Sequence, residues 1–382
     1  MIPYSRQNIS HEDIDAVSAV LRSDFLTQGP VIKKFESAVA EYCGASHAIA
    51  TVNATAALHV AMMLCDVSDQ DIVWVPAISF VATANCARYC DATVTFLDCD
   101  KDTGLLSLNG LDEKLLQADK AGLLPKVLVV VHLAGQSVDM KRVYELCNPY
   151  NISIVEDASH ALSGEYKGRR IGCCWYSDFT IFSFHPVKPL TSGEGGMLVT
   201  NHTSVVARAR RLIGHGIERN VEHHLYDTKD PWYYEQQELG FNYRLSDIHG
   251  ALGLSQLSRL DGFLLDRERL ASHYRQRLSE REIPLASLTQ NSDCRSSWHL
   301  YVVQCENREY RDRFLDRLRK AGFGANLHYM PIPAHPYYVA LGMKMSDFPN
   351  AQAYAETSLS LPLFPGLQVA HLDKVLGLAL EL

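Results

Sequence analysis

The chain has 382 residues, 47% of them hydrophobic, and a formal net charge of −8. This length allows one large domain and a smaller one with a sizeable core. The negative charge argues against binding to nucleic acid or to an anionic membrane, although local basic groups could still hold a small anion. The opening residues, MIPYSRQNISHEDID, lack the basic and apolar regions of a signal peptide, and no apolar run reaches transmembrane length. We therefore expect a cytoplasmic protein without a membrane partner.

Short apolar runs alternate with helix-like segments between residues 30 and 250. Residues 29–44, GPVIKKFESAVAEYCG, predict an amphipathic helix that Gly44 ends. The run PKVLVVVHLAG is apolar almost throughout, as in a strand buried on both faces. Strands are predicted at 47–52, 71–76, 93–98, 125–135, 152–161, 177–184 and 195–201, with further helices at 53–67, 78–92 and 138–151. This alternation predicts an α/β fold with a mostly parallel sheet and helices on both of its faces.

The pattern changes after about residue 250. Residues 247–281 predict a long helical stretch and residues 298–305 a strand. Residues 308–322 predict a helix with a glycine stop, and residues 325–332, ANLHYMPI, a further strand. We therefore predict a large α/β domain at residues 1–250 and a small α+β domain at residues 251–382.

The ten cysteines include no CxxC pair, and most of them lie inside apolar runs. This usage predicts small buried thiols in a reducing compartment. Ligands with the clustered spacing of a zinc site are absent from the sequence, so no metal site is predicted.

Ligands of parallel sheets bind beyond the carboxyl ends of the strands, which makes the polar residues there candidates for chemistry. NATAAL follows the first strand and places small residues at a helix N-terminus, where backbone N–H groups can bind a phosphate. Thr55 could equally be an ordinary helix residue. Asp157, in VEDASH, follows a buried strand and would need a cationic partner, unless it forms a structural ion pair or a helix cap. His160 could simply be a hydrogen-bonded histidine.

The stretch SFHPVKPLTSGEGG, residues 183–196, places Lys188 between two prolines at a strand end. Desolvation and nearby cations lower the pKa of such a lysine, which favours the neutral amine that Schiff-base chemistry needs. A lone loop lysine would instead be structural. A phosphate site, an aspartate and a lysine, in that order, together match pyridoxal phosphate (PLP). Its phosphate binds a helix N-terminus, its pyridine nitrogen pairs with a carboxylate, and its aldehyde reacts with a lysine.

The sequence also resembles, almost end to end, the DegT/DnrJ/EryC1/StrS family of PLP-dependent sugar-nucleotide aminotransferases, which share the fold-type-I architecture of aspartate aminotransferase. The matching stretches are LTQGP, NATAAL, PAISFVATAN, VEDASHA, SFHPVKPLTSGEGG, GFNYRLSDIHGALGLSQL and NLHYMPI. FVATAN, SHAL, SFHPVKP and ALGLSQL look most like one branch of this family. That branch makes UDP-4-amino-4,6-dideoxy-N-acetyl-β-L-altrosamine for pseudaminic acid.

The resemblance implies roles for individual residues. Lys188 and Asp157 are the implied catalytic pair, and Asn242 is expected to reach the phosphate of the neighbouring subunit. Phe80 would lie over the cofactor ring, unless it is a core helix residue. The cofactor-binding residues that the family pattern implies are Ala54, Thr55, Phe80, Asp157, His160, Ser183, Lys188 and Asn242.

Substrate contacts follow from the same resemblance, at Tyr4, Thr27, Gly29, His185 and His328. Tyr4 could instead anchor the N-terminus, and His328 could be a plain strand-end histidine. His185 could touch the substrate or tune the lysine amine. Many relatives have a serine or a glycine-rich variant where this chain has Asn53, which leaves the role of Asn53 open.

The implied function is transfer of an amino group from L-glutamate to C4 of a nucleotide-linked 4-keto-6-deoxy sugar, in a homodimer with shared active sites. The favoured substrate is UDP-2-acetamido-2,6-dideoxy-β-L-arabino-hexos-4-ulose. Alternatives are another 4-keto or 3-keto sugar linked to UDP, dTDP or GDP, a PLP-dependent sugar dehydratase, and a non-catalytic sugar-binding relative. The dehydratase branch has histidine where this chain has Lys188, and this difference favours transamination.

Overall fold

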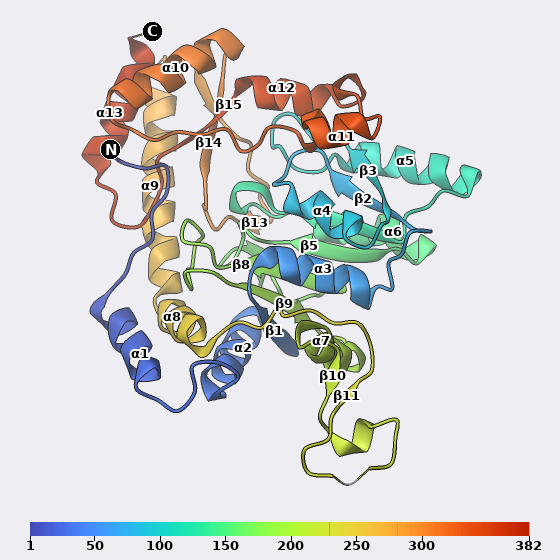
Figure 1. Ribbon diagram of the computed structural model, residues 1–382. Coiled ribbons are helices and arrows are strands. Elements are labelled where there is room, and N and C mark those ends of the chain that lie inside the picture. Colours follow the sequence, from blue (N-terminus) through green and yellow to red (C-terminus); the bar gives the residue numbers. More distant parts are fainter. Residues whose placement is uncertain (229, 281, 382) are drawn as a thin grey trace.

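The computed structural model describes residues 1–228, 230–280 and 282–381, and its centre is a seven-stranded sheet (Figure 1). The strand order is β1-β9-β8-β5-β4-β2-β3. The pairs from β3 to β8 are parallel, whereas β9 is antiparallel to both of its neighbours. The predicted mostly parallel sheet is thus confirmed, and each strand lies within its predicted range. The strands are β1 (His47–Thr51), β2 (Ile72–Pro76), β3 (Thr93–Leu97), β4 (Val127–Val131), β5 (Ser153–Asp157), β8 (Phe179–Ser183) and β9 (Gly196–Thr200).

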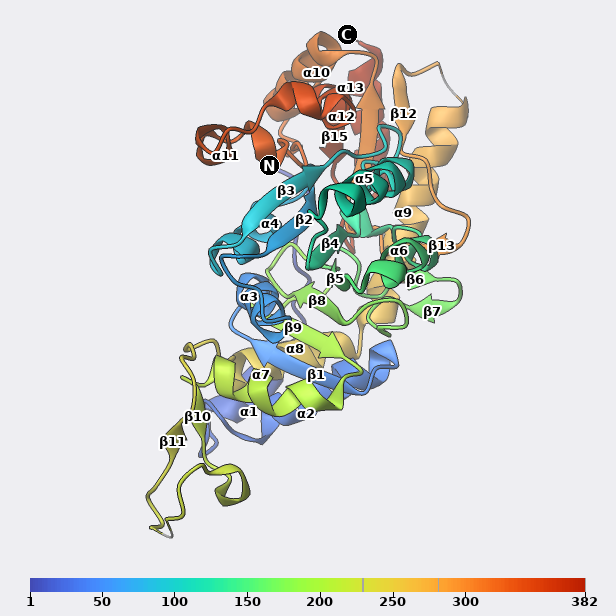
Figure 2. The same cartoon turned by 90° about the vertical axis from the view of Figure 1, so that its right-hand side faces the viewer.

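Helices cover both faces of this sheet. Figure 2 shows α3 and α4 on one side of it and α5 and α6 on the other. The helix predicted at residues 29–44 is α2, which has Pro30 in its first turn and ends at Gly44 in the left-handed region, at φ 72°. The helices around the sheet are α2 (Pro30–Cys43), α3 (Ala54–Leu64), α4 (Ala82–Arg88), α5 (Leu108–Ala121), α6 (Met140–Cys147) and α7 (Val206–Ile213).

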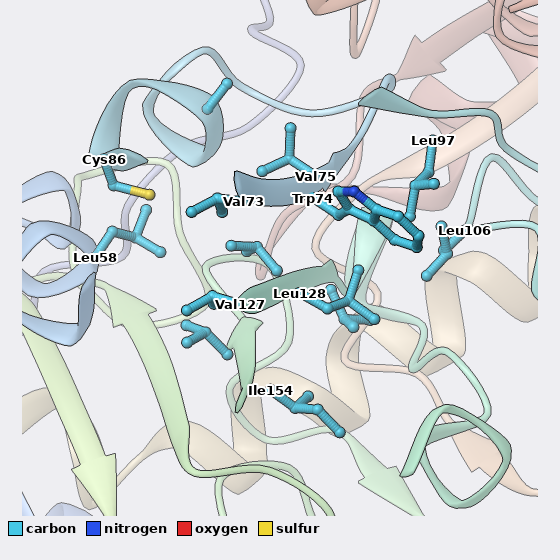
Figure 3. Close-up of a cluster of buried hydrophobic side chains, with 14 of the residues drawn as sticks. Leu58, Val73, Trp74, Val75, Cys86, Leu97, Leu106, Val127, Leu128 and Ile154 are labelled. Atoms are coloured by element: carbon cyan, nitrogen blue, oxygen red, sulfur yellow. The ribbon is translucent and has the colours of Figure 1, made fainter. Parts of the chain in front are cut away.

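The main hydrophobic core lies between the sheet and these helices. Every residue of β4 is buried, as its continuous apolar run predicted. Trp74 of β2 is in register with Leu128 of β4, and Leu58 of α3 and Cys86 of α4 belong to the same cluster (Figure 3). Because both faces are buried, the polar residues that follow each strand gather at the carboxyl edge of the sheet.

A second, smaller sheet has the order β12-β14-β15 and its own hydrophobic cluster. Ile2 pairs with Phe323, so the first residues of the chain also lie against this part. A second sheet with its own cluster is what a predicted small domain requires, but the boundary between residues 250 and 251 stays a prediction. The elements are α9 (Leu260–Glu280), β12 (Leu285–Ser287), β14 (Tyr301–Cys305), α10 (Arg308–Lys320), α11 (Pro336–Ala340), α12 (Pro349–Thr357), β15 (Ser358–Leu361) and α13 (Val369–Leu380).

Two predicted elements differ from the structure. The stretch at 247–281 forms two helices, α8 (Asp247–Leu257) and α9, because the chain turns at Ser258, whose hydroxyl donates to Ser255 O at 2.7 Å; residue 281 lies outside the described residues. The strand predicted at 325–332 is wrong. Of this stretch only Asn326 pairs, with Ser360 of β15, and Pro331 has no N–H with which to extend a ladder.

The remaining elements are short and lie at the edges of the fold. A β10–β11 hairpin projects from the body beyond α7 (Figure 1). All ten cysteines are free and are buried or partly buried, which confirms the burial predicted for them. The elements are α1 (His11–Leu21), β6 (Glu165–Tyr166), β7 (Arg169–Arg170), β10 (Ile217–Glu218), β11 (Glu235–Gln236) and β13 (Cys294–Arg295), with 3-10 turns at Leu133–Gly135, Asn148–Tyr150, Thr203–Val205, Val221–His223, Ile332–Ala334 and Met345–Asp347.

Across the described ranges, none of the helices combines the length and the apolar character needed to cross a bilayer.

Candidate active site

A cavity of about 490 Å³ opens at the carboxyl edge of the large sheet. Its walls come from the ends of β5 and β8, from the N-terminus of α3, and from residues 299–329 beside the small sheet. The structure brings most of the residues proposed from the sequence together here. Those that line the cavity are Tyr4, Ala54, Thr55, Phe80, Asp157, His160, Ser183, His185, Lys188 and His328.

The N-terminus of α3 forms one wall of the cavity. Asn53 caps the helix, because its Oδ1 accepts the N–H of Ala56 at 2.9 Å. The N–H groups of Ala54 and Thr55 precede the first intrahelical bonds and meet no protein acceptor within the described chain. They are therefore free to bind an anion at the positive end of the helix.

Gly196, the first residue of β9, passes directly beneath this helix terminus. A Cβ placed on Gly196 would lie 2.5 Å from Ala54 N, which is closer than any real contact. The glycine therefore lets β9 pair in the sheet without displacing the backbone that forms the wall. The contact that requires a glycine at position 196 is thus with Asn53 and Ala54.

Asp157 ends β5 and is buried. Its Oδ2 accepts the hydroxyl of Thr83 at 2.7 Å, and its Oδ1 accepts the hydroxyl of Ser159 at 2.6 Å. Side chains alternate along a strand, so the preceding Glu156 points the other way, where it bonds to His132 Nε2 at 2.6 Å. Of these two neighbouring carboxylates, only Asp157 therefore faces the cavity.

His160 is held in one tautomer by its neighbours. Its Nδ1 accepts the backbone N–H of Ala134 at 3.3 Å, so the ring proton lies on Nε2, which bonds to the Tyr329 hydroxyl at 2.9 Å. Burial, followed by the charges of Lys188 and His328, lowers the pKa of His160 well below its usual value. A neutral His160 thus fixes the position of the Tyr329 hydroxyl.

Lys188 lies in a tight turn, in which its backbone N–H donates to His185 O at 2.9 Å. The hydroxyl of Ser5 holds the preceding residue, because it donates to Val187 O at 2.9 Å. Burial lowers the pKa of the Lys188 amine to about 8, although the charge of Asp157 acts in the opposite direction. At pH 8 about half of the amine is neutral, against about 0.3% for an unperturbed lysine.

The remaining cavity residues divide by exposure. Phe80 is 57% exposed, which is inconsistent with its alternative interpretation as a core helix residue. His185 is exposed at the mouth of the cavity. His328 is buried, and its Nδ1 bonds to Ser360 Oγ at 2.8 Å; burial and then Lys188 lower its pKa to about 3. Tyr4 packs against His328 with 5.0 Å between ring centroids.

Three residues proposed from the sequence do not line this cavity. Thr27 pairs with Ser246, and the N–H of Gly29 donates to the buried Asp247 at 2.7 Å. Gly29 therefore has a structural role at the start of α2. Asn242 pairs with Gly214, at the base of the hairpin. Their proposed contacts with substrate or cofactor stay predictions.

Several residues of the site were missed by sequence reasoning. Thr83 and Ser159 hold Asp157, and Tyr329 bonds to His160. Thr83 and Ser159 lie inside the stretches FVATAN and VEDASH, but nothing in either pattern predicts bonds to one carboxylate. His299 lies near the start of the strand predicted at 298–305 rather than after a strand, so the rule of strand carboxyl ends did not find it.

The arrangement fits PLP. The free N–H groups of Ala54 and Thr55, together with Ser183, can hold its phosphate, and Asp157 can hold its pyridine nitrogen. Lys188 supplies an amine that is partly neutral near neutral pH. Partners for the phosphate, the pyridine nitrogen and the aldehyde of PLP thus all line one cavity.

Comparison with known proteins agrees with this arrangement. The model of the DegT/DnrJ/EryC1/StrS aminotransferase family matches residues 7–378. The UDP-4-amino-4,6-dideoxy-N-acetyl-β-L-altrosamine transaminase of Campylobacter jejuni is 36% identical over 95% of this chain and 92% of its own.

Solved structures of sugar aminotransferases are similar over the whole chain. PseC from Helicobacter pylori, described as an aminotransferase involved in the biosynthesis of pseudaminic acid, has a TM-score of 0.89 and 30% identity, covering 100% of this chain and 98% of its own. The putative sugar aminotransferase Spr1654 from Streptococcus pneumoniae, in its PMP form, has a TM-score of 0.89 and 28% identity, covering 99% and 98%.

Replacement of Gly196 by alanine tests the wall formed by α3. We expect Gly196→Ala to weaken PLP binding at least about tenfold, because the added methyl group displaces the Asn53–Ala54 backbone. PLP affinity is measured by fluorescence titration of the cofactor-free protein. Gly262→Ala is the matched control, since nothing lies within 4 Å of its Cβ. Equal affinity of the two variants would contradict the assignment.

The pKa of Lys188 is testable by chemical labelling. In the cofactor-free protein, acylation of Lys188 should rise with a midpoint near pH 8, measured by mass spectrometry of its peptide. Lys101 is the control, because its hydrogen bond to Asp102 raises its pKa. Asp157→Asn should move the Lys188 midpoint to lower pH, since it removes a charge that raises this pKa. A Lys188 midpoint near that of Lys101 would refute the desolvation argument.

Proposed function

We propose, because this chain belongs to the DegT/DnrJ/EryC1/StrS aminotransferase family, that it transfers an amino group from L-glutamate to C4 of a UDP-linked 4-keto-6-deoxy sugar. The chain is a PLP-dependent sugar aminotransferase. The proposed substrate is UDP-2-acetamido-2,6-dideoxy-β-L-arabino-hexos-4-ulose. The activity named for the C. jejuni relative and the pathway of PseC support this choice. The observation that carries the proposal is Lys188, a partly neutral amine in the same cavity as Asp157 and a free helix N-terminus.

Bound PLP supplies an electron sink that stabilises a carbanion beside the transferred nitrogen. The protein's residues prepare and use that chemistry. Asp157 keeps the pyridine nitrogen protonated, and its bonds from Thr83 and Ser159 fix its carboxylate. Ala54, Thr55 and Ser183 anchor the phosphate, so that the reacting atoms keep a fixed distance from Lys188.

Lys188 is the proposed general base and acid. Its Nζ takes the proton from Cα of glutamate in the first half-reaction and returns a proton to C4 of the sugar in the second. One amine can do both because a pKa of about 8 leaves each protonation state well populated near neutral pH. The two substrates therefore use the same cavity in turn, as in a ping-pong reaction.

The sugar nucleotide is proposed to enter beside Tyr4, His185 and His328, which line the cavity around Lys188. Phe80, exposed at the same cavity, is proposed to lie over the cofactor ring. A lysine at position 188 supports transamination over dehydration, since a dehydratase of this family has a histidine there.

A homodimer with shared active sites is also proposed. The β10–β11 hairpin and the residues that flank it expose Val221, Leu225, Tyr226, Trp232 and Leu239, each at least 67% exposed. This hairpin projects from the body of the fold (Figure 2). Exposed apolar side chains on such a segment are typical of a surface that a partner covers. Asn242 follows the hairpin directly and does not line the cavity of its own chain. A second copy could place Asn242 at its partner's phosphate site.

Substrate identity is tested with the purified holoenzyme. L-glutamate and a panel of UDP-, dTDP- and GDP-linked 4-keto sugars are incubated with it, and products are identified by mass spectrometry and NMR. We expect amination of the proposed UDP sugar at C4. Lys188→Ala should lose at least about 10³-fold in turnover yet still bind PLP non-covalently, because it removes the general base. Preferred amination of another sugar would overturn the substrate, and an active Lys188→Ala would overturn the mechanism.

Shared sites are tested by mixing two inactive variants. Lys188→Ala and Asn242→Ala chains, refolded together in equal amounts, should recover about a quarter of wild-type activity, because half of the dimers are hybrids with one intact site. Each variant refolded alone is the control. Recovery is expected only if Asn242 acts in the partner's site; a mixture as inactive as its components would place Asn242 in its own chain's site.

A further inference from the structure

One buried imidazole of the cavity has a ring nitrogen that no group of the described residues bonds. His299 lines the cavity and is 2% exposed. Its Nδ1 is fully buried without a hydrogen bond, and within the described residues no protein group bonds its Nε2 either. Buried polar groups are nearly always paired, so an unpaired imidazole nitrogen in a residue that lines a cavity favours a ligand that pairs with it.

The backbone around His299 is fixed, although its ring is not bonded. His299 O accepts Arg267 Nη1 at 3.1 Å, and Ser297 Oγ donates to His160 O at 2.6 Å. The N–H of Leu300 donates to Ala134 O at 3.2 Å. The His299 ring also packs against that of His160, with 4.5 Å between centroids. Backbone hydrogen bonds and ring packing thus hold the imidazole in place, and its nitrogens take no part.

The surroundings of His299 favour an anion. Burial lowers its pKa most, and the neighbours that lower it further are all basic; of these, Arg267 and the partly protonated Lys188 carry positive charge, whereas His160 and His328 are neutral near neutral pH. A neutral imidazole in such a field can donate an N–H to a carboxylate, and hydrogen bonds to charged acceptors are among the stronger ones. No arginine is among the described residues that line the cavity.

We propose that His299 binds the α-carboxylate of the amino donor. This inference rests on the proposed function only in requiring an amino acid as donor. Every amino acid carries its carboxylate one bond from the Cα at which Lys188 takes the proton, so the carboxylate lies near Lys188. His299 lines the same cavity as Lys188 and has an unpaired ring nitrogen. His185 and Glu194, by contrast, are exposed at the mouth, where a larger sugar nucleotide extends.

The test separates the two substrates. His299→Phe keeps a ring of similar size and removes both nitrogens, and His299→Asn restores one N–H. In the PLP form, which has no amino group to transfer to 2-oxoglutarate, titration calorimetry should show 2-oxoglutarate binding weakened about 10- to 100-fold in His299→Phe. His299→Asn should recover part of that loss. The KM for L-glutamate should rise similarly, and the KM for the keto sugar should stay within about twofold, as expected if only the donor loses a hydrogen bond.

Two controls complete the design. His371 also has a buried, unpaired Nδ1 but does not line the cavity, so His371→Phe reports the structural cost alone. n-Propylamine, an amine without a carboxylate, should react equally slowly with wild type and His299→Phe.

Three results would overturn the inference: unchanged 2-oxoglutarate binding, a rise in the sugar KM instead, or a uniform loss that His371→Phe reproduces. If wild type aminates no 4-keto sugar but 2-oxoglutarate binding still depends on His299, the proposed function fails and this inference stands.

Discussion

Removal of one lysine amine from water is the constraint on which the rest of this site depends. Desolvation by the cavity walls lowers the pKa of Lys188. The same walls carry Asp157, whose negative charge raises that pKa. The carboxylate can stay close without binding the amine permanently, because Thr83 and Ser159 occupy it. The lysine therefore remains available to a substrate, and its environment is a balance of burial and charge.

The sequence predicted the parts of the site that follow strands. Asp157, Ser183 and Lys188 come at or just after buried parallel strands, and parallel strands end at one edge, so their proximity follows from topology alone. His299, Tyr329 and Thr83 could not be found this way. Their positions depend on how the small sheet and α4 pack against that edge, and side-chain periodicity does not encode packing between distant segments.

The same reason explains the elements that were predicted wrongly. Residues 325–332 have the composition of a strand, but only Asn326 pairs with β15. His328 and Tyr329 instead bond to Ser360 and His160, so this stretch follows the cavity wall rather than a sheet. The break between α8 and α9 falls at Ser258, a residue that a continuous helix would also tolerate. Local propensity predicts secondary structure poorly where tertiary contacts determine the conformation of the chain.

The two walls of the cavity come from parts of the chain that are far apart in the sequence. The N-terminus of α3, Asp157 and Lys188 all precede the end of β9, whereas His328 and its partner Ser360 lie more than 120 residues later. The opposite wall is incomplete until β15 pairs with β14 and offers Ser360 to His328. A nascent chain thus lacks one wall of the cavity until nearly all of its length has left the ribosome. The enclosed cavity that lowers the pKa of the lysine is one of the last features to form.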